Sequence, residues 1–441
     1  MRLSVATNFQ STLIDALQDY PVVELYGKLR QDAVGGGRAP YQLAPVGRRQ
    51  LAHHVSAARR AGMGFNYLLN SACLGNHEIT RQGQREIEKL LDWICRIGIG
   101  SVTVATPYLL TLIKTRFPQL KVRVSLFAGV ERVQKAKMWQ DLGADCIVLD
   151  SIQVNRELKT LEQIRRHVRC DLELLVNNNC LMNCALSPSH MNAIAHTAQS
   201  FHQTNGFFID WCFLKCTEMK LRAPINYIRS EWIRPEDLHV YEELGYDLFK
   251  IVERDIPTEV LTRRVKAYVE RRYDGNLLDL IQPFGFQGVK KNDRYYRRGL
   301  KWLLQHLFRP TLVNPLKLML LKRLADSRGM TSPIEGEAPV YIDNRALDGF
   351  IERFRENSCR DADCGECGWC AKFAAKAVRF DAPRRDETLA AYDALFGALN
   401  HGDMWRYLPR DHGACHECAC SSHASQPVQL AARKAGTLDG G

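Results

Sequence analysis

Eight short apolar runs alternate with helix-period segments over the first 280 residues, and this alternation restricts the fold more than any other feature of the chain. The clearest helical patterns between the runs lie at 84–97, 131–142, 161–168, 235–244 and 260–273. Eight strand–helix pairs in about 270 residues are what a (β/α)8 barrel requires. The sequence therefore predicts an α/β fold with a TIM-like barrel at 1–280, and an open doubly wound sheet is the alternative. The predicted strands are 3–6, 22–26, 65–69, 101–105, 122–127, 146–150, 172–176 and 248–252.

A polar but uncharged stretch follows the seventh predicted strand. Residues 174–209 contain no Asp, Glu, Lys or Arg, although 25% of the chain is charged. Two Cys-x3-Cys pairs mark this region, Cys180 with Cys184 and Cys212 with Cys216. Four thiolates suit an iron–sulfur cluster or zinc. Neutral amides and backbone N–H groups can donate to cluster sulfurs, which favours a 4Fe-4S cluster, while a structural zinc site with four cysteine ligands is the alternative.

The cysteines are predicted to lie at the end of the barrel that holds the active site, because active sites on such folds are formed by the loops after the strand C-termini. Cys180 follows the seventh predicted strand by four residues, so the insertion that ends at Glu231 is expected to cover the barrel mouth. Polar residues at other strand ends are candidates by the same argument, with turn formation or helix capping as the alternative. These residues are Glu24, Tyr26, Asn70, Cys73, Thr106, Asp150, Asn155, Glu253 and Arg254.

Several of these motifs together resemble those of a known family, the peptidase U-32 or collagenase-like proteins. Residues 173–184 read Glu-Leu-Leu-Val-Asn-Asn-Asn-Cys-Leu-Met-Asn-Cys, and Tyr-Asp-Gly-Asn-Leu follows at 273–277. The resemblance covers about 2–280, with Asn-Asn-Asn-Cys where the collagenase-like branch has His-Gly-Ala-Leu-Cys. It implies a barrel whose 4Fe-4S cluster is held by four cysteines, a family partner protein and an electron donor. The implied cluster ligands are Cys180, Cys184, Cys212 and Cys216.

Family members whose activity is understood look like oxygen-independent hydroxylation factors that act on RNA bases or on a quinone precursor, and prephenate is implicated in the RNA branch. The expected function is therefore hydroxylation or a related redox modification of an RNA base, a quinone precursor or a lipid. The catalytic candidates are Glu173, for proton handling, and Asn177 and Asn178, for orienting a ligand or donating to the cluster. For Glu173 the alternative is a structural ion pair with an arginine.

A collagenase-like peptidase, metal-dependent or cysteine-dependent, is one alternative function. The chain lacks the protease motifs H-E-x-x-H and G-x-S-x-G. His77-Glu78 begins like the first of these, but Arg81 stands where the second histidine would be. A cysteine nucleophile would be Cys73, beside Asn70 and His77. A radical S-adenosylmethionine motif is excluded because Ser187 stands where its third cysteine would be. A zinc-stabilised scaffold that binds RNA or a partner protein is the alternative without catalysis.

A second cysteine motif lies in a predicted small unit at 336–400. Its spacing, C-x4-C-x2-C-x2-C, is close to that of ferredoxins and predicts a second 4Fe-4S cluster, with zinc or unligated thiols as alternatives. Three further cysteines, Cys415, Cys418 and Cys420, lie in a predicted flexible tail at 401–441 and form a weak metal site at best. The motif cysteines are Cys359, Cys364, Cys367 and Cys370.

Positive charge is concentrated between the two units, in a predicted connector at 281–335. Residues 290–328 hold eleven Lys or Arg against two Asp, so they carry nine of the net +11 charges. Leucines recur there at helical spacing, which predicts a basic amphipathic helix. Such a helix can lie on an anionic membrane or bind RNA, and the alternative is a helix packed over the barrel. The density of leucine favours packing or lipid over nucleic acid.

The expected location is the cytoplasm, with peripheral attachment to a membrane. No signal-like segment or run of 18 apolar residues is visible in the 441 residues. The fifteen cysteines are clustered in a long chain, which fits reduced metal ligands better than disulfides.

Overall fold

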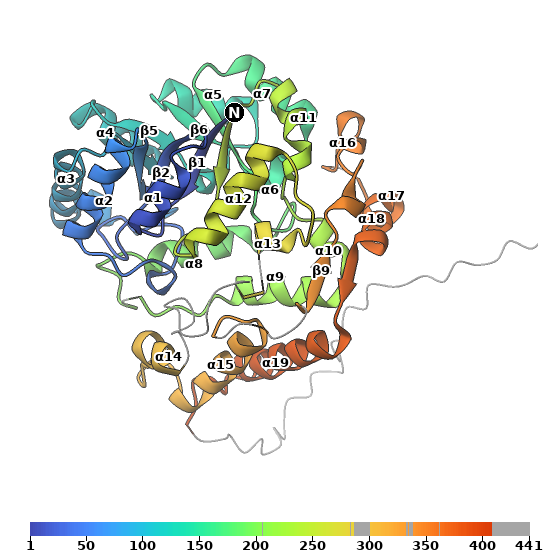
Figure 1. The fold of residues 1–441 in the computed structure, drawn as a ribbon. Coiled ribbons are helices and arrows are strands. Elements are labelled where there is room, and N and C mark those ends of the chain that lie inside the picture. Colours follow the sequence, from blue (N-terminus) through green and yellow to red (C-terminus); the bar gives the residue numbers. More distant parts are fainter. Residues whose placement is uncertain are drawn as a thin grey trace, which may run out of the picture.

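Eight parallel strands close into a barrel in the computed structural model (Figure 1). The structure describes residues 1–407 except 205, 283, 286–299, 332–333, 335–337 and 361. The eighth strand pairs with the first, so the predicted (β/α)8 barrel is confirmed and the open sheet is excluded. The strands are β1 (Arg2–Ala6), β2 (Val22–Gly27), β3 (Gly64–Leu69), β4 (Ser101–Val104), β5 (Lys121–Val124), β6 (Cys146–Val148), β7 (Asp171–Leu175) and β8 (Leu248–Ile251).

Helices surround the barrel and bury one apolar stripe each. In α3 (Arg81–Arg96) the buried positions include Ile87, Leu90, Leu91 and Ile94, which share one helix face. The Thr80 hydroxyl caps this helix by accepting from the Gly83 N–H at 3.0 Å. The other outer helices are α1 (Ser11–Leu17), α2 (Arg48–Arg60), α4 (Pro107–Arg116), α5 (Val133–Asp141), α6 (Ser151–Val154), α7 (Leu158–His167), α11 (Leu238–Glu243) and α12 (Thr258–Glu270), with 3-10 turns η1 (Pro40–Gln42), η2 (His77–Ile79) and η4 (Pro235–Asp237).

The predicted strand at 122–127 is wrong at its C-terminal end, and the reason is a turn. The strand β5 ends at Val124, and a 3-10 turn, η3 (Leu126–Ala128), follows. The Ser125 hydroxyl accepts from the Phe127 N–H at 3.2 Å, which favours the turn over further extension. Ser125 and Phe127 therefore line the space beyond the barrel end instead of continuing the sheet.

The segment between β7 and η4 crosses the barrel end at which the strands terminate (Figure 1). It forms α8 (Ser187–Thr197), α9 (Trp211–Arg222) and α10 (Ile225–Ile228). The predicted cysteine-bearing insertion after the seventh strand is thus confirmed. Residues 180–182 and 229–231 pair in antiparallel fashion, which fixes the two ends of the insertion to each other.

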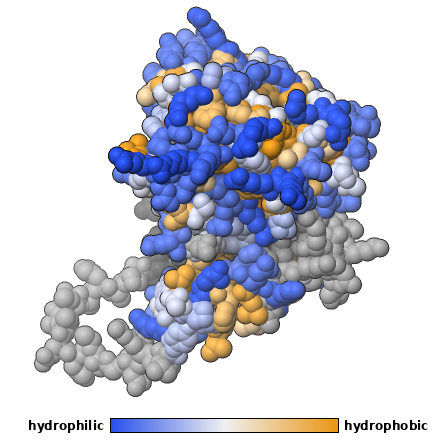
Figure 2. Space-filling view, turned by 90° about the vertical axis from the view of Figure 1, so that its left-hand side faces the viewer, coloured by the Kyte–Doolittle hydropathy of each residue, from blue (hydrophilic) through white to orange (hydrophobic). Residues whose placement is uncertain are grey.

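The chain after the barrel forms a second layer below and beside it (Figure 1). The helix α15 packs on α19, α19 packs on α9, and one hydrophobic core runs through the barrel and these helices. No described helix is long and apolar enough to cross a membrane. On the face shown in Figure 2, hydrophobic side chains gather in the lower part of the molecule, on the side where α14 lies. The elements are α13 (Leu278–Ile281), α14 (Leu300–Leu307), η5 (Pro315–Lys317), α15 (Leu318–Ser327), β9 (Val340–Ile342), η6 (Arg345–Leu347), α16 (Arg353–Glu356), α17 (Cys364–Cys367), α18 (Trp369–Ala377), β10 (Val378–Phe380) and α19 (Ala382–Asn400).

The small cysteine-rich unit is confirmed as a part of the fold, with β9 and β10 forming a two-stranded antiparallel sheet. Residues 286–299 of the basic connector lie outside the described residues. Residues 408–441, with Cys415, Cys418 and Cys420, also lie outside them. The unit boundaries at 280, 335 and 400 stay predictions.

Candidate functional site

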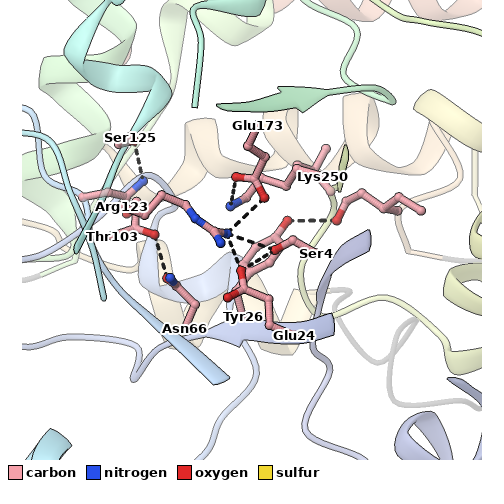
Figure 3. Close-up of polar contacts among 12 residues, drawn as sticks. Ser4, Glu24, Tyr26, Asn66, Thr103, Arg123, Ser125, Glu173 and Lys250 are labelled. Atoms are coloured by element: carbon pink, nitrogen blue, oxygen red, sulfur yellow. Dashed lines mark hydrogen bonds and ion pairs between the residues drawn. The ribbon is translucent and has the colours of Figure 1, made fainter. Parts of the chain in front are cut away.

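Four charged side chains meet inside the barrel, where most TIM-like barrels hold apolar layers (Figure 3). Arg123 of β5 donates to Glu24 of β2 and, at 3.0 Å, to Glu173 of β7. Lys250 of β8 lies 3.3 Å from the other oxygen of Glu173. Two acids therefore face two bases, so the buried ion group has no net charge. Such a balance offsets the desolvation cost of burying the four groups.

Glu173 is fully buried within this group. Its carboxylate accepts from Arg123 and Lys250, which corresponds to the structural ion pair that the sequence left as an alternative. Lys250 was missed by sequence reasoning, although a lone lysine inside the apolar run 248–252 was a usable signal. Its ammonium lies 4.2 Å from the ring centroid of Tyr26, and both side chains line the space beyond the strands. Burial lowers the pKa of Lys250, and Glu173 opposes that effect.

A cavity of about 340 Å³ lies at the C-terminal end of the barrel, between the strand ends and the insertion. The structure brings all four cysteines of the two Cys-x3-Cys pairs to its wall, together with Asn178 and Lys250. Other strand-end candidates that line it are Tyr26, Asn70, Glu253 and Arg254. Glu173, Asn177, Cys73, Thr106, Asp150 and Asn155 do not.

Local structure explains how the cysteines reach one wall. Cys212 and Cys216 lie four residues apart on α9 and so share a helix face. Asp210 caps this helix by accepting from the Phe213 N–H at 2.9 Å, and it also contacts His190 of α8 at 3.0 Å. The other pair lies on the loop before α8, where Asn183 adopts a left-handed conformation with φ 53° immediately before Cys184.

A buried carboxyl, Glu231, contacts the first cysteine. Its Oε1 accepts from the Cys180 N–H at 3.2 Å and from the side-chain amide of Asn178. That amide also donates to the Cys180 sulfur at 3.4 Å. Burial raises the pKa of Glu231, and burial together with Glu231 raises the pKa of Cys180. Sequence reasoning used Glu231 only as the end of the insertion, because nothing in the sequence pairs it with Cys180.

The two asparagine candidates have different contacts. Asn177 is fully buried and bonds to backbone on two sides: its amide donates to the Val252 and Leu280 carbonyls, and its oxygen accepts from the Val252 N–H. It therefore fixes the strand ends to each other. Asn178 alone of the two faces the cavity and a cysteine. Catalytic roles for Glu173, Asn177 and Asn178 stay predictions.

Cations outnumber acids on the cavity wall. Arg254 Nη1 and Arg264 Nη2 are buried and have no hydrogen-bond partner among the described residues. Burial, reinforced by Arg38, lowers the pKa of Arg254 to about 10. Arg264 was missed, although an arginine within the buried stripe of α12 is an unusual pattern. The wall cations are Arg38, Lys220, Lys250, Arg254, Arg264 and Arg328, against Asp210, Glu253 and Asp255.

The second cysteine motif borders a separate small cavity of about 20 Å³, lined by all four of its cysteines. Arg353 donates to the Cys367 sulfur at 3.0 Å. Glu157 of the barrel accepts from the Ser358 hydroxyl and the Cys359 N–H at 2.6 and 2.8 Å, so the motif is tied to the barrel. The backbone N–H at Trp369, with help from Arg353, lowers the pKa of Cys367.

The described cysteines are all free, and they include every member of the two motifs. Within the described residues, no three His, Cys, Asp or Glu side chains are grouped closely enough to hold a metal ion. The motif cysteines instead border two cavities.

The cysteine-peptidase arrangement around Cys73 does not form a hydrogen-bonded pair in the described structure. His77 contacts Glu86 at 3.0 Å and stacks on Phe201, with ring centroids 3.8 Å apart. The Cys73 sulfur accepts from the Gly75 N–H at 3.3 Å.

Comparison with known proteins gives the family. The model of peptidase family U32 matches residues 42–198, which include Cys180 and Cys184. An uncharacterized protease of Methanocaldococcus jannaschii is 30% identical over 347 residues, or 78% of this chain and 86% of the relative. A solved structure of a U32 peptidase is 20% identical with a TM-score of 0.44, and the match covers 58% of this chain and 94% of that one. The chain therefore belongs to peptidase family U32.

Proposed function

We propose that this U32 protein holds a 4Fe-4S cluster at its barrel mouth and carries out oxygen-independent hydroxylation, or a related redox modification, in the adjoining cavity. The observation that carries the proposal is that Cys180, Cys184, Cys212 and Cys216 line one cavity at the catalytic end of a TIM-like barrel. Four thiols on one cavity wall match the donor set of such a cluster in number and kind, and they must come closer together to hold it, since no three ligand side chains are grouped for a metal within the described residues. When bound, the cluster supplies one-electron redox chemistry. The choice of hydroxylation comes from the resemblance of residues 173–184 to U32 hydroxylation factors.

The residues around Cys180 have assigned roles in this proposal. Asn178 donates to the Cys180 sulfur and to Glu231, so it orients both groups. Glu231, whose pKa is raised by burial, accepts from the Cys180 N–H and is the carboxyl placed to exchange a proton beside this cysteine. Lys220 donates to the Asn179 carbonyl and places a positive charge next to the thiolates that a cluster requires. Asn177 and Glu173 act as positioning residues that maintain the strand ends.

The substrate or its oxygen donor carries negative charge in this proposal, because six cationic side chains, Arg254 and Arg264 among them, stand against three acidic ones on the cavity wall. Replacing C–H by C–OH withdraws two electrons from the substrate, and an organic oxygen donor is reduced by two electrons in exchange. A cavity of about 340 Å³ takes one small molecule or one extruded RNA base, not a folded RNA.

The second cysteine motif is proposed to hold a further 4Fe-4S cluster that passes electrons from a donor protein to the barrel, in the reduced environment of the cytoplasm. Cys364 is exposed there, and Arg353 donates to Cys367. Zinc is the alternative metal for this motif.

Anaerobic purification of the full chain tests the proposal. The expected preparation is brown, absorbs at about 400 nm and holds roughly four or eight irons with matching sulfide. The Cys180→Ser, Cys216→Ser double variant loses about four of the irons, while the control Cys170→Ser, outside both motifs, keeps all of them. Comparing modified nucleosides and metabolites of anaerobically grown cells with and without the gene then identifies the product.

Two outcomes contradict the proposal. A colourless preparation with stoichiometric zinc favours the scaffold function. Peptide cleavage that survives both Cys180→Ser and removal of iron restores the peptidase function.

A further inference from the structure

An exposed group of large apolar side chains lies on the second layer of the molecule, on α14, on α15, on the loop between them and after α19. Leu316 is 80% exposed and Trp405 56% exposed, far beyond what packing requires. Large contiguous apolar patches on soluble proteins mark interaction sites. The members of this group, here named the apolar face, are Leu304, Phe308, Leu312, Leu316, Met319, Trp405 and Tyr407.

The members come from two distant parts of the sequence that bond to each other. The Asn314 N–H donates to the Met404 carbonyl at 2.7 Å, and the Asn314 side-chain amide donates to the Arg406 carbonyl at 2.7 Å. The Tyr407 hydroxyl donates to the Pro310 carbonyl at 2.6 Å. Trp405 and Tyr407 therefore lie beside the 310–316 loop. In Figure 2 hydrophobic side chains gather in this lower part of the molecule.

The helices that carry the apolar face pack into the core through other residues. Leu303 and Leu307 of α14 and Leu318 and Leu324 of α15 are already buried. An amphipathic helix of a globular protein carries polar residues on its other side. Here Leu304, Phe308 and Met319 occupy outward positions instead, and nothing in the described part of the chain covers them.

Charge identifies the occupant of the face. Residues 300–323 contain five basic side chains and no Asp or Glu. An apolar face with exposed Trp and Tyr, mixed with Lys and Arg, matches the interface of an anionic bilayer. A second copy would bring the same positive charge against itself. The basic residues are Lys301, Arg309, Lys317, Lys322 and Arg323.

We propose that the apolar face binds an anionic membrane surface, so that the protein attaches peripherally without a spanning helix. The helix α15 connects the face to the barrel cavity, because Met319 lies at its start and Arg328, Gly329 and Met330, directly after its end, line that cavity. This proposal uses only surface residues and stands whether or not the cysteines bind iron.

Vesicle co-sedimentation of the full chain tests it. We expect binding to vesicles of phosphatidylcholine with one-third phosphatidylglycerol, weaker binding to phosphatidylcholine alone, and loss at high salt. The Phe308→Ser, Leu316→Ser double variant removes two apolar contacts and is expected to bind at least about tenfold more weakly. The control is Met138→Ser, because Met138 on α5 is 62% exposed, between Phe308 at 44% and Leu316 at 80%, and lies away from the face. The Lys301→Gln, Arg323→Gln variant is expected to lose most of the phosphatidylglycerol preference.

Three results would overturn the proposal. In the first, the double variant binds the anionic vesicles as well as the Met138→Ser control, with both folded by circular dichroism. In the second, the chain binds single-stranded RNA through the face and ignores vesicles. In the third, it forms a dimer in solution that Leu316→Ser dissociates.

Discussion

The two cysteine motifs of this U32 protein differ in the cavities they border and in the charges beside their sulfurs. The barrel motif borders the cavity of about 340 Å³ at the barrel end, and two of its cysteines, Cys180 and Cys184, lie within a stretch without charged residues. Burial raises the pKa of Cys180 and Cys216 there. In the C-terminal motif burial also raises the pKa of Cys359, to about 11, and of Cys370, but Cys364 is exposed and Arg229 and Arg353 lie on the cavity wall. The C-terminal motif therefore differs by one exposed cysteine and by Cys367, whose pKa is lowered.

This difference indicates a division of labour. Thiols with raised pKa release protons when metal binds, so under the proposed function loading of the barrel motif would release protons from the folded interior. A low-pKa thiol beside an arginine binds metal readily and favours a more reduced centre. An exposed, positively charged centre suits electron entry, and an interior centre beside a cavity suits chemistry on a substrate.

The largest expected effect comes from removing each motif separately. The Cys212→Ser, Cys216→Ser variant is expected to lose about half of the iron and to lower product formation by more than about a hundredfold, because its motif lines the substrate cavity. The Cys364→Ser, Cys367→Ser variant is expected to lose the other half and to slow turnover only with the natural electron donor. Iron analysis measures the first effect. Turnover with the natural donor, compared with turnover with a chemical reductant in its place, measures the second.

If the two variants lose turnover equally with the chemical reductant present, the proposed division between substrate chemistry at the barrel motif and electron entry at the C-terminal motif is wrong. Cys95→Ser serves as the control, since Cys95 lies on α3, outside both motifs.

The barrel and both motifs followed from the sequence because they depend on periodicity and spacing, which are local. The eight strands are predicted to within one residue at their starts. The charged group inside the barrel was not predicted, since Glu24, Arg123 and Lys250 lie far apart in sequence and meet only when the sheet closes. Single charged residues in three apolar strands were a signal for it.

Asn177 shows that a residue conspicuous in the sequence can lie outside the cavity. It stands in a conspicuous run of three asparagines, yet its side chain bonds to the backbone at Val252 and Leu280. Asn178, its neighbour, faces Cys180. Adjacent residues at a strand end point in opposite directions, and the sequence alone does not say which one faces the cavity.

An intermediate effect is expected from Arg353→Gln at the C-terminal motif. Loss of the guanidinium that donates to Cys367 is expected to raise the pKa of that thiol and to shift the midpoint potential of the second centre downward by on the order of tens of millivolts. Alkylation rates of Cys367 in metal-free protein against pH, and a redox titration of loaded protein, measure the two shifts. The matched control is Arg355→Gln, because Arg355 bonds to Glu243 and Glu352 instead of a cysteine. A titration in which both variants coincide with the parent would show that the arginine does not set the difference between the motifs.

The smallest effect concerns Asp150, a largely buried carboxyl that follows β6 and lies outside the cavity wall. Burial, reinforced by Glu231 and Glu131, raises the pKa of Asp150 to about 7. An acid with a raised folded-state pKa adds stability below about pH 4 that is lost as pH rises to about 7, because the folded chain then holds a proton that the unfolded chain has released. Asp150→Asn keeps the shape without this proton, so we expect it to raise the thermal midpoint by a few degrees at pH 8 and to change it little at pH 4. Thermal unfolding at both pH values measures this, with the exposed Asp141→Asn as the control. If the parent and Asp150→Asn differ equally at the two pH values, the pKa of Asp150 is not raised in the folded chain.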